Sequence, residues 1–250
     1  MEKMKDAAQY VEVGAPESDY LRVTRQGARL TVNLGGVAVM GEFERGDGKA
    51  GITHTCSPIF GPDKHKLYGL VQHGMMRNEP SKVNASTPNQ IMIKHIVTDA
   101  GYPPGVVVEE TLGIENSVFS FAMAHHNSGQ EKVPLNAGLH CYFDAPTGYK
   151  GTKVNNQDIS SLIEQHPDGA PIALPARSII QIPGKPQMQL VQDSFRFAMV
   201  WAGRNPQTDE IDKTYVCIEP IELHPDEFGQ PVSNLHPSGK RTSSFDLSYI

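Results

Sequence analysis

The chain has 250 residues, a formal net charge of −6, and 23 glycines and 19 prolines spread along its length. A single domain of this length is common for β-sandwiches and barrels, and frequent glycine and proline favour many short strands with tight turns. The modest acidity and the absence of lysine-arginine runs argue against nucleic-acid binding, and weakly against binding to anionic membranes.

The cysteines and the start of the chain favour a cytoplasmic protein. Cys56, Cys141 and Cys217 are odd in number and lack CxxC spacing, which is typical of buried thiols in a reducing compartment. The charged segment 1–6 lacks the apolar stretch of a signal peptide, and no apolar run approaches the roughly 20 residues of a membrane helix. We expect a soluble monomer or homodimer that does not bind membranes.

Several segments have the alternating or β-prone composition of strands. In chain order they are 28–34, 90–97, 106–114, 118–127, 195–201, 215–223 and 243–250. Residues 115–117 lie between two of them and have the composition of a hairpin turn. Alternation within 195–201 places Phe195, Phe197, Met199 and Trp201 on one face of that strand.

Evidence for helices is limited. Residues 158–165 could form one or two helical turns with Asp158 as the cap, and residues 1–9 a short helix or a frayed end. The proline-rich stretches 58–62, 102–104 and 167–186 are expected to be loops of one domain spanning residues 1–250. Loops of this kind often line binding sites.

Three polar clusters interrupt apolar, β-prone runs. They are His73-Gly74 with Arg77, His140 within 139–143, and Glu219 within 217–220. Two imidazoles and a carboxylate suffice to move two protons near neutral pH, so a general acid and a general base are available if the segments converge. Nothing in the sequence calls for a cofactor.

Each cluster also has a plainer interpretation. Glu219 shares a strand face with Tyr215 and Cys217, while Val216 and Ile218 face a core, but a surface glutamate would fit the same pattern. Pro220 suits a strand end or edge because it lacks one ladder hydrogen bond.

His140 on its own fits a core histidine bonded to backbone, and Arg77 fits a surface ion pair. Asp193 could accept hydrogen bonds from sugar hydroxyls or could be a turn residue. Trp201 could belong to the core or could stack on a sugar face.

The sequence offers no recognised metal or phosphate motif. His125 and His126 are adjacent, so on a strand they point to opposite faces and rarely serve one metal site. The chain lacks GxxxxGK[ST], a strand-linked GxGxxG and the nucleophile elbow GxSxG. We therefore expect no metal.

Taken in order, four motifs resemble the galactose mutarotase-like family, which includes aldose 1-epimerases and hexose-6-phosphate mutarotases. They are Ser57-Pro58-Ile59-Phe60-Gly61, the segment 72–77, the segment 136–143 and the segment 215–220, and the resemblance extends from about residue 28 to the C-terminus. It implies a large antiparallel β-sandwich with few short helices and a sugar-binding cleft on one sheet.

The resemblance also implies a reaction and its residues. Glu219 would take the proton of the anomeric hydroxyl and His140 would protonate the ring oxygen, for which an imidazole pKa of about 6.5 is suitable. His73, Arg77 and Asp193 would bind the sugar. The activity implied is a cofactor-independent aldose 1-epimerase, with a hexose or hexose phosphate as the small-molecule partner.

Some positions depart from the family pattern and leave the substrate open. Cys141 replaces a proline that many members have, and 54–56 stands where sugar-phosphate members have a glycine pair and an arginine. Arg77, Lys64 and Lys66 could still meet a phosphate. One alternative is a non-catalytic carbohydrate-binding or sensory protein. Another is a lyase or glycoside hydrolase acting on a polymer, although the single well-supported carboxylate argues against the usual hydrolase with two carboxylates.

Overall fold

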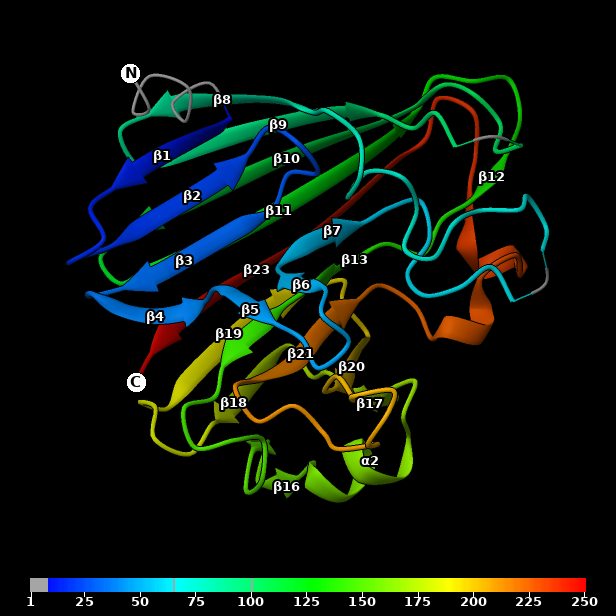
Figure 1. Ribbon diagram of the computed structural model, residues 1–250. Coiled ribbons are helices and arrows are strands. Elements are labelled where there is room, and N and C mark those ends of the chain that lie inside the picture. Colours follow the sequence, from blue (N-terminus) through cyan, green and yellow to red (C-terminus); the bar gives the residue numbers. More distant parts are fainter. Residues whose placement is uncertain (1–8, 65, 100) are drawn as a thin grey trace.

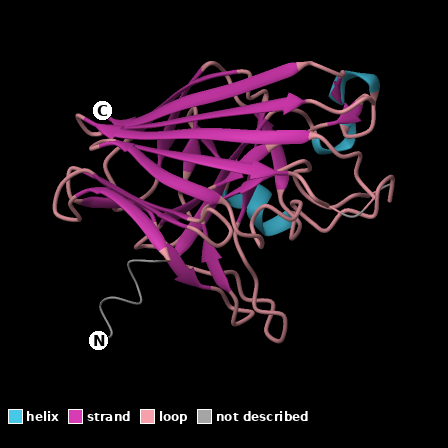
Figure 2. Ribbon diagram, turned by 90° about the horizontal axis from the view of Figure 1, so that it is seen from above, coloured by secondary structure: helices cyan, strands magenta, loops and turns pink. Residues whose placement is uncertain are grey.

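The computed structural model describes residues 9–64, 66–99 and 101–250, and these form an all-β sandwich of two large antiparallel sheets. Figure 1 shows the sheets with most of their strands labelled, and Figure 2 shows the strands in two layers. The predicted antiparallel β-sandwich is therefore confirmed.

The first sheet carries the candidate site and has ten strands within the described residues. Its main path runs β1-β2-β3-β4-β14-β21-β13-β7, with β20 beside β21 and β17 beside β20. Its strands are β1 (Tyr10–Gly14), β2 (Tyr20–Thr24), β3 (Leu30–Leu34), β4 (Val37–Met40), β7 (His54–Cys56), β13 (Gly138–His140), β14 (Tyr142–Asp144), β17 (Ala170–Ala173), β20 (Phe197–Trp201) and β21 (Tyr215–Ile221).

The second sheet forms the back of the sandwich, in the order β16-β15-β18-β19-β23-β11-β10-β9-β8. Its strands are β8 (Lys82–Thr87), β9 (Gln90–Ile96), β10 (Val106–Glu115), β11 (Val118–Asn127), β15 (Lys153–Val154), β16 (Gln157–Asp158), β18 (Arg177–Gln181), β19 (Met188–Asp193) and β23 (Lys240–Tyr249). Two small ribbons pair β5 (Glu42–Glu44) with β6 (Ala50–Ile52), and β12 (Val133–Pro134) with β22 (Asn234–Leu235).

The core lies between the sheets, because alternate residues of each long strand face inward. Along β11, Phe119, Phe121 and Met123 are fully or almost fully buried, and the rings of Phe121 and Phe245 stack with centroids 5.3 Å apart. Burying each such side chain contributes about 1.5–3 kcal/mol, so this alternation fixes which face of each strand turns inward.

Most of the predicted strands are confirmed with small changes in their ends. Residues 28–34, 90–97, 106–114, 118–127, 215–223 and 243–250 correspond to β3, β9, β10, β11, β21 and β23. The hairpin between β10 and β11 turns at Asn116 and Ser117, which both have positive φ, as two-residue hairpin turns require.

Three expectations about local structure were wrong. Residues 167–186 are not only loop, since they contain β17 and β18; Pro171 is tolerated because β17 pairs only with β20 and is an edge strand. Phe195 precedes β20 and packs in the core against Phe121, on the opposite side from Phe197. Pro220 lies in a central strand, opposite the gap between β13 and β14.

Helical structure is sparse in the described residues. The expected helix is α2 (Ser160–Gln165), and the short 3-10 turns are η1 (Pro225–Glu227) and η2 (Pro231–Ser233). Ile159 rather than Asp158 is the N-cap of α2, although Asp158 accepts the Ser160 amide at 2.8 Å. The helix or frayed end expected at residues 1–9 falls almost wholly outside the described residues.

Candidate active site

His140 lies beside Glu219 because strands β13 and β14 both pair with β21 and the strand pairing is interrupted between them. Gly138 pairs with Ile221 and Tyr142 with Cys217, so the chain between β13 and β14 lies opposite Glu219 on β21. The Nδ1 atom of His140 lies 3.5 Å from Oε1 of Glu219, and both side chains are buried, with 6% and 3% of their surface exposed. Two predicted residues therefore meet as a buried pair.

Alternation along β21 explains why Glu219 faces this side. Val216 and Ile218 pack in the core between the sheets, as predicted, while Tyr215, Cys217 and Glu219 point the other way. All seven residues of β21 are nevertheless buried, because loops and a hairpin cover its outer face. The carboxyl group is thus buried beneath these segments and does not lie on an open surface.

His73 reaches the same cluster from a tight loop. Its own φ is 66°, and the Cβ of any residue at Gly74 would lie 1.9 Å from the Ser57 carbonyl oxygen, so glycine is required there. The Gly61 amide donates to Nδ1 of His73 at 3.1 Å, and Cys56 Sγ lies 3.2 Å from the same atom. Because Nδ1 accepts, the ring proton is on Nε2, which is a donor.

A third imidazole, His54, completes the cluster. Its Nδ1 lies 2.7 Å from the Ile52 carbonyl oxygen and must donate to it, which leaves Nε2 as an acceptor that makes no hydrogen bond with the described residues. The ring centroid of His140 lies 5.0 Å from that of His54 and 5.1 Å from that of His73. We call His54, His73, His140 and Glu219 the imidazole-carboxyl cluster.

Burial favours the neutral form of every member of the cluster. Desolvation lowers the pKa of His54 to about 4, and it lowers the pKa values of His73 and His140 well below 6.5, with nearby positive charge adding to the effect. Desolvation raises the pKa of Glu219 well above 4.5, against a smaller lowering by the Cys217 thiol. The expected ordinary imidazole pKa for His140 is therefore wrong.

Aromatic rings form one wall of the cluster. The His140 ring stacks on Tyr142 with centroids 4.7 Å apart, and the Trp201 ring meets His140 edge-on at 5.9 Å. The Arg45 guanidinium lies 5.0 Å from the centroid of Trp201. Trp201 thus packs against the cluster and against Arg45, and it is not among the residues that line the cavity beside the cluster.

The β5–β6 hairpin covers the outer face of β21. The Gly46 amide donates to Asp212 Oδ1 at 2.9 Å, and the Tyr215 hydroxyl donates to Asp212 Oδ2 at 2.6 Å. The ring of Phe43 packs on that of Tyr215, with centroids 5.4 Å apart. The hairpin is thereby held against the same strand that carries Glu219.

A cavity of about 280 Å³ opens beside the cluster. It is lined in part by His54 and Tyr142, which both contact the His140 ring, so His140 lies directly behind its wall. The cationic side chains of its lining are Arg29, Arg45, Lys49 and Arg77. The polar mouth and the buried acid-base pair together make this the candidate site.

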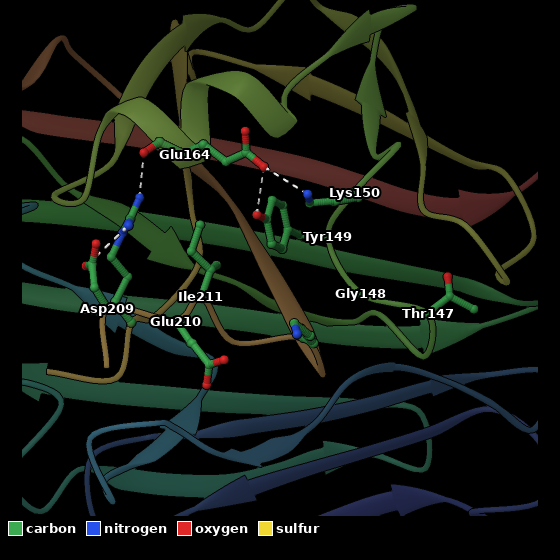
Figure 3. Close-up of a pocket in the computed structure, with 10 residues that line it drawn as sticks. Thr147, Gly148, Tyr149, Lys150, Glu164, Asp209, Glu210 and Ile211 are labelled. Carbon is green, nitrogen blue, oxygen red and sulfur yellow. Dashed lines mark hydrogen bonds and ion pairs between the residues drawn. The ribbon is translucent and has the colours of Figure 1, made fainter. Parts of the chain in front are cut away.

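A larger cavity, of about 390 Å³, lies elsewhere, between α2 and the loop before β21. Figure 3 shows Lys150 directed at Glu164, and these two form an ion pair at 3.4 Å. A second ion pair of the lining joins Arg204 and Asp209 at 3.3 Å. The Tyr149 hydroxyl also donates to Glu164. None of the imidazole-carboxyl cluster lines it, so we assign the chemistry to the smaller cavity.

The predicted site residues are thus only partly brought together. Glu219, His140 and His73 converge, and Arg77 lines the cavity beside them. Asp193 lies at the exposed end of β19 in the other sheet, where its carboxylate contacts Ser194.

The structure also places Lys64, considered above for a phosphate, and the adjacent residues His125 and His126. Lys64 forms an ion pair with Asp226 at 2.7 Å. His125 and His126 point to opposite faces, as expected, with His125 buried against Ser57 and His126 exposed.

Sequence reasoning missed His54, Tyr142 and Arg45 as site residues. The signal for His54 was present, since it alternates with Cys56 before the Pro58-Ile59-Phe60-Gly61 loop. Sequence reasoning also missed a set of metal-ligand types: His140, Cys217 and Glu219 offer ligand atoms within 4.8 Å of one another.

Comparison with known proteins gives the fold a family context. No family model and no curated protein matches the sequence. Three similar solved structures are a galactose mutarotase related enzyme from Lactobacillus acidophilus (15% identity, TM-score 0.75, 96% of this chain and 97% of that chain), a galactose mutarotase-like protein from Lactobacillus casei (12%, 0.73, 96% and 100%), and a galactose 1-epimerase from Lactobacillus acidophilus (12%, 0.69, 96% and 94%).

These likenesses cover nearly the whole of each chain, so the fold is that of the galactose mutarotase-like proteins. Identities of 12–15% establish the fold alone. Among the described residues, no helix has the length and apolar character needed to span a membrane.

Proposed function

We propose that this protein with the galactose mutarotase-like fold is a cofactor-independent aldose 1-epimerase that interconverts the α and β anomers of a hexose or hexose phosphate. The observation that carries the proposal is the buried pair of His140 and Glu219, with Nδ1 and Oε1 3.5 Å apart. Anomer exchange needs one proton to leave the anomeric hydroxyl and one to reach the ring oxygen, and this pair supplies both transfers.

The proton count of the pair suits this reaction. With Glu219 protonated and His140 neutral, the two groups hold one proton between them, because burial raises the carboxyl pKa and lowers that of the imidazole. The reactive arrangement, carboxylate and imidazolium, holds the same single proton. Hydrogen bonds from the entering sugar hydroxyls favour the carboxylate and so promote the shift to His140.

From that arrangement the steps balance. Glu219 takes the proton of the anomeric hydroxyl while His140 gives its proton to the ring oxygen, and the bond from C1 to the ring oxygen breaks to give the open aldehyde. The aldehyde end rotates about the adjacent C–C bond. The ring then closes on the other face with the two roles exchanged: His140 takes the proton of the ring hydroxyl and Glu219 gives its proton to the aldehyde oxygen. This restores the carboxylate and the imidazolium.

The surrounding residues support sugar binding. His73 has its proton on Nε2, because Nδ1 accepts from Gly61, so it can donate to the ring oxygen or a neighbouring hydroxyl. The free Nε2 of His54 can accept from a hydroxyl. Arg77 lines the cavity and can bind another oxygen with its planar group of donors.

The cations at the mouth of the cavity favour a phosphorylated sugar. Asp47 pairs with Arg45 at 2.9 Å and Lys49 at 3.5 Å, which offsets part of the positive charge. Within the described ranges, Arg29 and Arg77 enter no recorded salt bridge. Two unneutralised guanidinium groups in a chain of net charge −6 support recognition of an anionic substituent.

Magnetisation-transfer NMR on glucose, galactose and their 6-phosphates tests the proposal. We expect acceleration of anomer exchange in proportion to enzyme concentration, with the 6-phosphates preferred. Arg77→Met should raise KM for a 6-phosphate by about 10-fold or more, the scale of one charged hydrogen bond, and should change KM for the unphosphorylated sugar little. Equal effects on both sugars would contradict the phosphate role.

A non-catalytic carbohydrate-binding or sensory protein is the second candidate. One observation favours it: Glu219 and His140 are almost fully buried and are not among the residues that line the cavity. Saturable binding of sugar in calorimetry, without acceleration of exchange for any sugar in the panel, would support that function instead.

We further propose a cytoplasmic setting for the protein. Its three cysteines are free thiols and are all buried, which fits a reducing compartment. Retained activity and unchanged stability in a strong thiol reductant would agree with this setting, whereas a loss of either would contradict it.

A further inference from the structure

Cys217 has no part in the proposed reaction, yet it lies beside the two groups that do. It precedes Glu219 by two residues on β21 and so faces the same side of the strand. Its Sγ, a carboxylate oxygen of Glu219 and a ring nitrogen of His140 all lie within 4.8 Å of one another, and all three residues are buried. We propose that these residues form a binding site for a soft divalent cation, Zn²⁺, which competes with the sugar.

The ligand set matches the chemistry of zinc. Thiolate, imidazole and carboxylate are its usual protein ligands, and three of them leave a fourth position of the tetrahedron open for water or substrate oxygen. The thiolate also selects against Mg²⁺ and Ca²⁺, which prefer oxygen ligands. The set therefore favours Zn²⁺ over the common hard cations.

An unsatisfied ring nitrogen points to the same ligand. Nδ1 of His140 is buried and makes no hydrogen bond in the described structure, and Oε1 of Glu219 is 3.5 Å away. Ligand atoms around tetrahedral zinc lie about 3.5 Å apart, given bond lengths of about 2.0–2.3 Å. The His140–Glu219 distance already has this value, and the Cys217 sulfur lies within 4.8 Å of both.

The charges balance on binding. Zn²⁺ displaces one proton from the Cys217 thiol and one from the Glu219 carboxyl, so the buried assembly of cation, thiolate and carboxylate has no net charge. Arg45 and Arg77 lie near enough to lower the pKa of the cluster histidines, and their charge favours loss of these protons while opposing the cation. Because the assembly is neutral overall, the two effects largely cancel.

Metal and sugar would need the same atoms. Glu219 and His140 cannot serve as ligands of a cation and transfer protons to a sugar at the same time, so bound zinc would stop anomer exchange. This inhibition rests on the proposed function, whereas metal binding itself does not. Binding is therefore tested first, in a measurement that needs no activity.

Cobalt(II) alone, titrated into the purified full chain, is the probe. We expect one equivalent to bind, with a near-ultraviolet thiolate-to-metal charge-transfer band and the strong visible bands of tetrahedral cobalt, both abolished by Zn²⁺. Calorimetry with Zn²⁺ in two buffers of different ionisation enthalpy should show release of about two protons per ion.

Cys217→Ser is the test variant and Cys141→Ser the matched control, since Cys141 packs in the core. In Cys217→Ser the charge-transfer band should disappear. Loss of a residue that only supports a metal ligand lowers metal affinity by about 10- to 100-fold, so loss of a ligand itself should lower Zn²⁺ affinity by more than that. The control should bind as the wild type does.

The wild-type cobalt spectrum decides the proposal even if Cys217→Ser does not fold. No binding of cobalt, or binding without a thiolate band, would overturn it, as would an unchanged band in Cys217→Ser. If the metal binds as described but no sugar undergoes exchange, the proposed function fails and the metal site stands.

Discussion

Replacing Glu219 by glutamine should make the protein more stable, by an amount that grows with pH. In the folded protein burial raises the pKa of Glu219 well above 4.5, so the native state keeps a proton that the unfolded chain loses. A carboxyl group whose pKa is higher in the folded than in the unfolded protein stabilises the fold least at high pH. Its contribution to the free energy of unfolding is fully present below the unfolded pKa and is lost as pH rises toward the folded pKa. Glutamine keeps the shape and does not titrate.

The size of the effect follows from proton linkage. Where the unfolded carboxyl is ionised and the folded one is not, stability falls by about 1.4 kcal/mol per pH unit. From about pH 5 upward the wild type should therefore lose stability relative to Glu219→Gln, at a rate of up to about 1.4 kcal/mol per pH unit. Contributions from all other titrating groups are shared by both proteins and cancel in the difference.

Urea unfolding at pH 5, 6, 7 and 8 measures this difference. Glu110→Gln is the matched control, because Glu110 is also a buried carboxyl but with a pKa raised to about 7. For Glu110 the difference should grow up to about pH 7 and then level off. The pH at which the Glu219 difference levels off reports the folded pKa of Glu219 on the same scale.

Two results would refute the reasoning. A difference that stays near zero from pH 5 to pH 8 would mean that Glu219 is solvated in the folded protein. A Glu219→Gln variant that is less stable than the wild type by the same amount throughout this range would mean that the pKa of Glu219 is lowered, as in an ion pair with a protonated His140, and the free protein would then already hold the reactive charge arrangement.

Further predictions concern catalysis and packing. His140→Asn should slow anomer exchange by about 10²–10⁴-fold in protein that urea unfolding shows to be folded, although the lost ring packing lowers its stability; a smaller loss of rate would exclude His140 as the general acid. The exchange rate should show no titration of a free imidazole near pH 6.5, because burial lowers the pKa of His140 well below that value; a sharp optimum near pH 6.5 would contradict the burial argument. Gly138→Ala should cost about 1–3 kcal/mol, because its Cβ would lie 2.5 Å from the Pro220 carbonyl oxygen, whereas Gly113→Ala, 3.6 Å from its nearest neighbour, should be tolerated in the same urea assay.

Alternation along a strand was enough to predict which face of β21 carries Glu219. Since side chains alternate, Cys217 and Glu219 had to share one face and Val216 and Ile218 the other, and the structure confirms both. The long hairpin of β10 and β11 was equally local, because its pattern and its turn lie close together in sequence.

Features that depend on distant segments could not be predicted in this way. His54 enters the site because β7 pairs with β13, more than 80 residues later, and no local pattern encodes that pairing. Pro220 suggested an edge because a proline breaks a ladder, but its strand is central and the gap between β13 and β14 accommodates it. The depressed pKa of His140 likewise follows from burial by these distant segments and not from its neighbours in sequence.

The most direct test of the central claim is anomer exchange by magnetisation-transfer NMR in the wild type and in Glu219→Gln, at equal concentrations and with sugar binding checked by calorimetry. We expect acceleration by the wild type, and exchange at the uncatalysed rate in a folded, sugar-binding Glu219→Gln. Exchange that remains fast in this variant would contradict the assignment of proton transfer to the pair of His140 and Glu219.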